Sequence, residues 1–234
     1  MNRVSVQAEP HEFEFELERA ALLVIDMQHD FCSPGGFLSS RGADVSRMRM
    51  PIAPLRRVLA TCRAAGLTII HTREGHRPDL ADCPPSKLLK SRKAGRGIGD
   101  EGPLGRVLVR GSRSHAIIEE LAPAPDEIVV DKPGKGAFFA TDLDLILRTK
   151  AITHLIIGGV STNVCVQSTA REAADRGYWN LVLEDCCAAA LPELHRYSIE
   201  MIKYGGGIFG CVSTAEAFVG ALAAAPVPGG VVRP

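Results

Sequence analysis

Short apolar segments alternate with amphipathic ones along this chain of 234 residues, and this alternation constrains the fold more than any other feature. The apolar segments 20–25 and 154–160 have the length of buried strands, and the second is rich in β-branched residues. Apolar residues at helical spacing fill 51–65, where Gly66 marks the helix end, and a second helical segment covers 164–176. Alternating strands and helices are typical of a parallel sheet covered by helices on both faces. We therefore predict an α/β fold.

The same pattern places the other elements and leaves one long segment without any. Further strands are expected at 67–71, 127–130, 179–183 and 209–212, and further helices at 142–149 and 194–204. Residues 72–114 form a long stretch rich in Gly, Pro and Arg. Because so long a loop is uncommon in a compact domain unless it builds a lid or a site wall, we predict that it forms the wall of an active site.

Length and composition fit one globular domain that binds a small molecule. We expect a single domain over 1–234, with a polar, acidic N-terminal extension at 1–19 and a flexible tail at 222–234. The formal net charge is zero, which argues against a nucleic acid or a charged membrane surface as partner. No apolar run reaches the roughly eighteen residues that a membrane span needs, and no N-terminal stretch has the pattern of an export signal.

The cysteines indicate a reducing compartment. There are seven, an odd number, and they are scattered without the paired spacing of a metal site. Such usage is typical of reduced thiols, so we expect a cytoplasmic protein. Cys32, Cys186 and Cys187 are interpreted as packing residues.

Three reactive side chains, Asp26, Lys132 and Cys165, come just after predicted strands. Taken singly, each has a structural explanation: a carboxylate that caps a turn, a lysine in solvent, a cysteine that packs a helix onto a sheet. Because the carboxyl ends of parallel strands meet at one edge, where ligands bind, we expect the three to converge. A base, a cation and a thiol together are typical of an activated nucleophile, and a cysteine in the first turn of a helix favours the thiolate.

Motifs around these residues carry a resemblance to a known family. They are Ile25-Asp26-Met27-Gln28 with Asp30-Phe31, Asp131-Lys132-Pro133 with Gly136-Ala137-Phe138, and Gly159-Val160-Ser161-Thr162-Asn163-Val164-Cys165-Val166. In order and spacing they resemble the isochorismatase-like cysteine hydrolases, over about 20–218. The resemblance implies a Rossmann-like, three-layer α/β/α domain with a roughly six-stranded, mostly parallel sheet. It also implies no cofactor and a homo-oligomer, either a dimer or a tetramer.

The resemblance also implies a role for each site residue. Cys165 would attack an amide carbonyl, Asp26 would serve as general base and acid, and Lys132 would support the charges. The family places a cis peptide bond that precedes no proline shortly before the cysteine, here between Val160 and Ser161. The backbone N–H groups of Ser161 and Cys165 would then form an oxyanion hole.

The segment 71–80 bears on which branch of the family the chain resembles. Nicotinamidases carry a metal there, bound by one Asp and two His; here Glu74 and His76 could bind a metal, but Leu80 falls near the place of the second His. Because a catalytic metal normally needs three protein ligands, we expect no metal. The segment looks most like that of biuret and triuret hydrolases, which implies a small planar ureide or amide as substrate, in a pocket with several hydrogen-bond partners and few apolar walls.

Candidate substrate contacts follow from the same resemblance. At Gly205 biuret hydrolase has a glutamine, so biuret loses a polar partner and a longer or differently substituted ureide becomes plausible. Two alternatives stay open: hydrolysis of a vinyl ether as in isochorismatases, which requires no nucleophilic cysteine, and a silent member of the family that only binds. The candidate contacts are Gln28, Phe31, Arg73, Glu74, Phe138 and Gly205.

Overall fold

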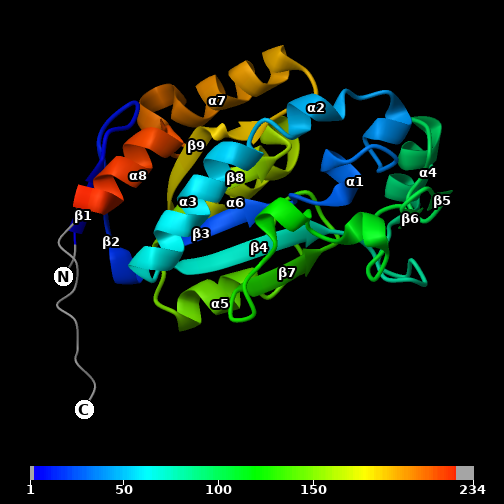
Figure 1. Cartoon of the computed structure of the whole chain (residues 1–234), viewed down its shortest axis with the longest axis horizontal. Coiled ribbons are helices and arrows are strands. Elements are labelled where there is room, and N and C mark those ends of the chain that lie inside the picture. Colours follow the sequence, from blue (N-terminus) through cyan, green and yellow to red (C-terminus); the bar gives the residue numbers. More distant parts are fainter. Residues whose placement is uncertain (1–2, 225–234) are drawn as a thin grey trace.

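The computed structural model describes residues 3–224 and contains a central sheet of six strands, all parallel. The two strands that pair with β3 set the register at its carboxyl end, where Ile25 lies opposite Thr72 and Gly159. The α/β fold with a parallel, six-stranded sheet is therefore confirmed (Figure 1). In spatial order the strands are β10 (Cys211–Ser213), β9 (Trp179–Ala188), β8 (His154–Val160), β3 (Ala20–Ile25), β4 (Thr68–Glu74) and β7 (Ile128–Lys132).

Alternate residues of the buried strands face two different helical layers, which makes three layers in all. Ala21, Leu23 and Ile25 of β3 belong to one apolar core, with side chains of α5 (Leu143–Thr149), α6 (Gln167–Asp175) and α7 (Pro192–Gly207). Leu22 and Val24 belong to the other core, with α3 (Ile52–Ala65) and α8 (Ala215–Ala224). Each fully buried Leu or Ile in these cores stabilises the fold by about 1.5–3 kcal/mol relative to an exposed one.

The N-terminal extension expected at 1–19 is part of the second core in its described residues. It forms an antiparallel hairpin of β1 (Arg3–Val6) and β2 (Phe13–Glu16). Phe15 stacks on Phe218 of α8 with ring centroids 6.2 Å apart. Helix α8 itself was not predicted; its alanine-rich sequence has no clear amphipathic spacing. Residues 225–234 of the expected flexible tail lie outside the described residues.

Residues 72–114 contain more regular structure than expected. Strand β4 runs on to Glu74, and the segment then forms α4 (Pro85–Lys93), β5 (Glu101–Gly102) and β6 (Gly105–Arg106). Together with the short helix α1 (His29–Cys32), these elements gather beyond the carboxyl ends of the strands (Figure 1). A further short helix, α2 (Val45–Met48), precedes α3. The segment thus stands where a wall of the site is expected.

Gly159 allows β8 to approach β3 where both strands end. Its φ is 125°, a value that L side chains rarely adopt, and an added Cβ would lie 2.1 Å from the carbonyl oxygen of Ile25. The two strand ends that carry Asp26 and Cys165 are therefore held close by a residue without a side chain.

Within residues 3–224, no helix combines the length and the apolarity needed to cross a bilayer.

Helix α1 carries a buried carboxylate, that of Asp30. Asp30 is fully buried; its Oδ2 accepts a hydrogen bond from the Leu108 N–H at 3.0 Å, while Oδ1 has no partner in the part of the chain described. Burial raises the pKa of Asp30 from its ordinary 3.8 to about 6, so the wild type loses stability as the pH rises from 3.8 through 6. We expect Asp30→Asn to raise the free energy of unfolding by about 3 kcal/mol above pH 7, and by little below pH ~4. Urea unfolding from pH 4 to 8 measures this; a gain independent of pH would contradict it.

Candidate active site

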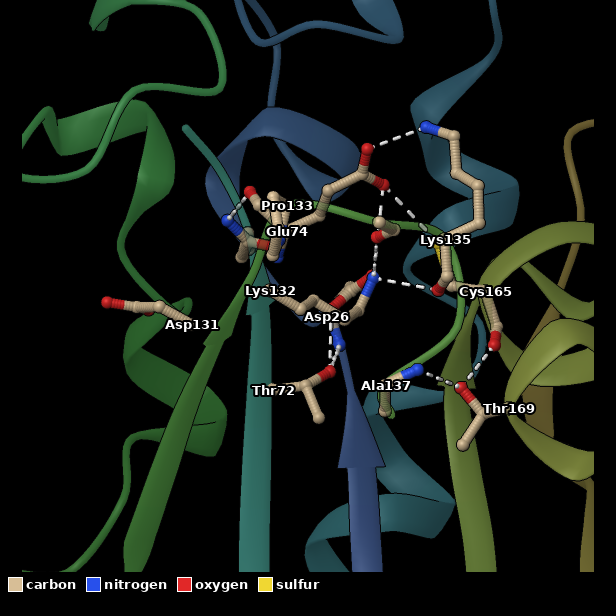
Figure 2. Close-up of polar contacts among 12 residues, drawn as sticks. Asp26, Thr72, Glu74, Asp131, Lys132, Pro133, Lys135, Ala137, Cys165 and Thr169 are labelled. Atoms are coloured by element: carbon tan, nitrogen blue, oxygen red, sulfur yellow. Dashed lines mark hydrogen bonds and ion pairs between the residues drawn. The ribbon is translucent and has the colours of Figure 1, made fainter. Parts of the chain in front are cut away.

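The parallel sheet brings the three predicted catalytic side chains to one edge. Asp26 follows β3, Lys132 ends β7, and Cys165 lies in the π-helical turn Thr162–Val166 that follows β8. Lys132 Nζ lies 2.7 Å from Asp26 Oδ2, and both side chains are fully buried. One carboxylate oxygen of Asp26, one of Glu74 and the Sγ of Cys165 lie within 4.8 Å of one another. Figure 2 shows the cluster above the strand ends.

Asp26 and Lys132 are fixed by neighbours as well as by each other. Asp26 has a left-handed backbone with φ 50°, and its Oδ1 accepts a hydrogen bond of 2.6 Å from the Thr72 hydroxyl. Lys132 Nζ donates to the carbonyl oxygens of Gly134 and Lys135 at 3.0 and 2.9 Å. The ammonium group therefore ties the loop after β7 to the carboxylate after β3 (Figure 2).

Glu74 lies at the centre of the cluster, as the last residue of β4. The Cys165 thiol donates a hydrogen bond to Glu74 Oε2 at 3.5 Å. Glu74 Oε1 accepts from Lys87 Nζ at 2.9 Å and from Lys135 Nζ at 2.6 Å. These two lysines were not predicted as site residues, although Lys135 follows Lys132 by three residues in the same motif.

Burial and the neighbouring ammonium groups act in opposite directions on the pKa values of Cys165 and Glu74. Burial raises the pKa of the Cys165 thiol well above its usual range, and Lys132 only partly opposes this. Burial would also raise the pKa of Glu74, but Lys132, Lys135 and Lys87 outweigh it and hold that pKa well below the usual range. The low thiol pKa expected at a helix N-terminus is therefore wrong, because burial removes the sulfur from water.

The charges of the cluster nevertheless balance around a thiolate. Two buried carboxylates, Asp26 and Glu74, face three ammonium groups, so the cluster carries one net positive charge while Cys165 keeps its proton. Despite its burial, Lys132 has a raised pKa, because Asp26, Cys165 and Glu74 surround it. Loss of the thiol proton to water would bring the net charge to zero, and its transfer to Asp26 would leave the net charge unchanged. The resting group is thus a thiol in surroundings that accept its anion once a base takes the proton.

Two of the candidate substrate contacts have other partners. The side-chain amide of Gln28 accepts from the N–H of Glu74 at 2.7 Å and donates to its carbonyl oxygen at 3.0 Å, so it positions Glu74. Arg73 forms a bidentate pair with Asp131, at 2.7 and 3.0 Å. Neither side chain lines the cavity beside Cys165.

The two predicted aromatic contacts differ in their placement. Phe31 lines the cavity, whereas Phe138 belongs to the core between α5 and α6 and stacks on Tyr178 with centroids 5.8 Å apart. The next residue, Phe139, is 58% exposed and lines the cavity instead. Ser161 also lines the cavity, and the expected cis bond between Val160 and Ser161 is confirmed.

Gly205 does not lie near the catalytic cluster. It is at the end of α7, which leads back to the start of β10, and Cys211 there pairs with Leu181 near the start of β9. A connection between parallel strands ends at the amino edge of the sheet, opposite the edge that carries Cys165. Within one chain, an absent side chain at Gly205 therefore does not widen the pocket.

A cavity of about 580 Å³ opens beside Cys165. Much of its wall is apolar, which contradicts the expectation of few apolar walls, because the segment 31–38, Ile98 and Phe139 bring aliphatic and aromatic side chains to it. The lining residues include Phe31, Phe37, Leu38, Arg41, Glu74, Lys87, Lys90, Ile98, Lys135, Phe139, Ser161, Val164 and Cys165.

The donor atoms do not fit a metal. Among the described residues, one group of three potential ligands lies close together, namely Asp26, Glu74 and Cys165. The ammonium of Lys132 already lies 2.7 Å from Asp26 and 4.0 Å from Glu74, where it supplies the positive charge that a metal ion would bring. His76, the other residue considered as a metal ligand, forms a hydrogen bond to Asp82 through Nδ1.

Comparison with known proteins agrees with this geometry. A cysteine hydrolase from Pseudomonas syringae pv. phaseolicola 1448A is 28% identical with a TM-score of 0.77, over 94% of this chain and 97% of that one. N-carbamoylsarcosine amidase from Thermoplasma acidophilum is 25% identical with a TM-score of 0.65, over 85% and 97%. Pyrazinamidase/nicotinamidase from Streptococcus mutans UA159 shares the fold, with a TM-score of 0.66 at 21% identity over 83% and 99%.

The family model for the isochorismatase domain matches residues 20–217, which include all the strands of the central sheet and the whole catalytic cluster. The chain belongs to the isochorismatase family of hydrolases.

Proposed function

We propose that this hydrolase cleaves a C–N bond of a small amide or ureide through a thioester on Cys165. The observation that carries the proposal is the buried thiol within one cluster of Asp26, Lys132 and Glu74, at the wall of a cavity large enough for a substrate. A thiol, a carboxylate base and an ammonium group are the components of nucleophilic catalysis on a carbonyl.

Each step has a residue to perform it. Asp26 takes the thiol proton as the Cys165 sulfur attacks the carbonyl carbon, and the N–H groups of Ser161 and Cys165 hold the resulting oxyanion. The C–N bond breaks as Asp26 returns the proton to the nitrogen, which leaves as ammonia or an amine. Asp26 then takes a proton from water as the water oxygen attacks the thioester carbon; the C–S bond breaks, Asp26 returns the proton to the sulfur, and the acid leaves.

We assign the base to Asp26 although the thiol bonds to Glu74. Three ammonium groups surround Glu74 and hold its pKa low, which makes it a poor proton acceptor. Its carboxylate faces the cavity beside Cys165, where it can accept N–H groups of an amide or ureide. Glu74 therefore serves as the contact for the substrate nitrogen, and it holds Lys87 and Lys135 in place.

A biuret-like substrate is one case of this proposal, and the cavity also accommodates larger amides. Vinyl-ether hydrolysis is the second candidate, because Arg41, Lys87 and Lys90 line the cavity and such a substrate carries carboxylates. A silent binding member is disfavoured, because Lys132 Nζ lies 2.7 Å from Asp26 Oδ2 and a carboxylate oxygen of Asp26 lies within 4.8 Å of Cys165 Sγ. A homo-oligomer and a cytoplasmic location stay predictions; exposed apolar side chains on α7, such as Tyr197, Met201 and Tyr204, support the first.

A panel of amides tests the proposal. We expect ammonia release from at least one of biuret, triuret, ureidoacrylate, N-carbamoyl amino acids and nicotinamide, with kcat/KM of about 10⁴ M⁻¹s⁻¹ or more. Mass spectrometry of the quenched reaction should find the acyl adduct on Cys165. Cleavage of isochorismate with no ammonia release from any amide would favour the second candidate and contradict the first.

A further inference from the structure

We propose that the cavity binds substrates in which an apolar segment joins the scissile amide to a carboxylate, and that Arg41 and Lys90 bind this carboxylate. The inference deepens the proposed amide hydrolysis and rests on it. Arg41 and Lys90 form a second site within the cavity, at the end away from Cys165. No residue of this second site belongs to the catalytic cluster.

The first observation is the positive charge of the segment that forms part of the cavity wall. In a chain of zero net charge, residues 84–96 hold five basic residues and no acidic one. Lys87 is neutralised by Glu74, whereas Lys90 and Arg41 have no carboxylate within 4.0 Å among residues 3–224. Both line the cavity; the carboxylate of Asp82 also lines it, but it pairs with His76 and Arg110, so Arg41 and Lys90 have no anion of their own there.

Arg41 is held in a position to receive that anion. Its Nη2 donates to the carbonyl oxygen of Ser91 at 2.7 Å, and its guanidinium lies over the ring of Phe37, 3.8 Å from the centroid. Its Nε is buried and has no hydrogen-bond partner in the described part of the chain. Nη2 also donates to the carbonyl oxygen of Arg96 at 3.5 Å, whereas Nη1 has no hydrogen-bond partner among residues 3–224, so the stacked group still has N–H donors to offer.

Helix α4 sets the distance between the two ends of the cavity. At its first turn Lys87 contacts Glu74 and the carbonyl oxygen of Pro133, beside the nucleophile. Four residues later Ser91 contacts Arg41. This stretch of α-helix rises about 6 Å, so the second site lies several bonds away from a carbonyl at Cys165. Lys90 follows Lys87 by three residues and so lies on the same face of the helix.

Besides the charged residues at its two ends, the cavity is lined by apolar side chains. Phe31, Phe37 and Leu38 come from the segment before Arg41, Ile98 comes from the loop after α4, and Phe139 comes from the loop after β7. A neutral ureide the size of biuret would leave these walls and the two cations in contact with water only. A carboxylate on an apolar segment pairs with both features, and its single charge is easier to remove from water than that of a phosphate.

Matched pairs of substrates test the proposal. The probes are 4-(ureidomethyl)benzoate and adipic acid monoamide, each compared with its methyl ester by ammonia release. We expect the wild type to have a KM at least tenfold lower for the acid than for the ester. Arg41→Gln and Lys90→Gln should each raise the KM of the acid at least fivefold with kcat and the ester little changed. Lys93→Gln, on the same helix and outside the cavity, should match the wild type.

A second measurement separates this proposal from the hydrolase itself. We expect 4-(bromomethyl)benzoate to alkylate Cys165 at least tenfold faster than its methyl ester does, and Arg41→Gln or Lys90→Gln to remove the difference. Selective alkylation without hydrolysis of any amide would leave the second site standing and overturn the hydrolase. Equal rates for acid and ester, with or without hydrolysis, would overturn the second site. Because Lys90 is exposed, Lys90→Gln carries the test if Arg41→Gln does not fold.

Discussion

Cys165→Ala is expected to lower amide hydrolysis by about four to six orders of magnitude, because no other group in the cavity can form the thioester. The side chain is 3% exposed and packs in the core beside α6, so the lost sulfur leaves a small gap. We expect the free energy of unfolding to fall by no more than about 2 kcal/mol. Ammonia release and urea unfolding, measured on the same preparation, test both parts.

Cys187→Ala is the matched control for this variant. Cys187 is also buried, and in the sheet it pairs with Gly159, close to the end of β8 that precedes Cys165. It does not line the catalytic cavity. The control should lose similar stability and keep its activity within about twofold. Retention of a tenth or more of the wild-type rate in Cys165→Ala would exclude the thioester, and retained cleavage of isochorismate would indicate vinyl-ether chemistry.

The sheet and the positions of the three candidate catalytic side chains could be predicted because they depend on local pattern. A strand that ends at Ile25 places Asp26 at the carboxyl edge whatever its neighbours are, and the same holds for Lys132 and Cys165. The lengths of the strands depend on their partners as well. Strand β4 continues to Glu74 because Glu74 pairs with Lys132 of β7. That pairing puts Glu74 inside the cluster, and the apolar pattern of β4 alone does not show it.

Contacts between distant segments could not be predicted in this way. Lys87 reaches Glu74 because α4 folds back over the strand ends, and no periodicity in residues 72–114 encodes that path. The choice between Phe138 and Phe139 depends on the turn after Gly136, where an added Cβ would lie 2.3 Å from a carboxylate oxygen of Glu172. Gly205 was assigned to the pocket by resemblance, whereas the chain direction of α7 takes it to the opposite edge of the sheet.

Lys132→Met is expected to lower both stability and activity, for one physical reason. The substitution keeps an unbranched side chain that is one atom shorter, and it removes the only ammonium in contact with the buried carboxylate of Asp26 among the described residues. An unpaired charge in a fully buried position costs about 3–5 kcal/mol. The carbonyl oxygens of Gly134 and Lys135 lose their donor as well. We expect hydrolysis to fall by about two to three orders of magnitude, since the charges that form during attack on the carbonyl lose their nearest cation.

Two further variants separate the charge effect from a general loss of packing. Lys135→Met also removes an ammonium, but that side chain is 45% exposed and contacts Glu74, not Asp26, so it should cost no more than about 1 kcal/mol. The double variant Asp26→Asn with Lys132→Met removes the unpaired charge, and it should regain at least half of the lost stability without regaining activity. If the double variant were as unstable as Lys132→Met, packing and not the isolated carboxylate would explain the loss. Urea unfolding of the four proteins at pH 7 decides between these explanations, because an unpaired Asp26 carboxylate can destabilise only those that keep it.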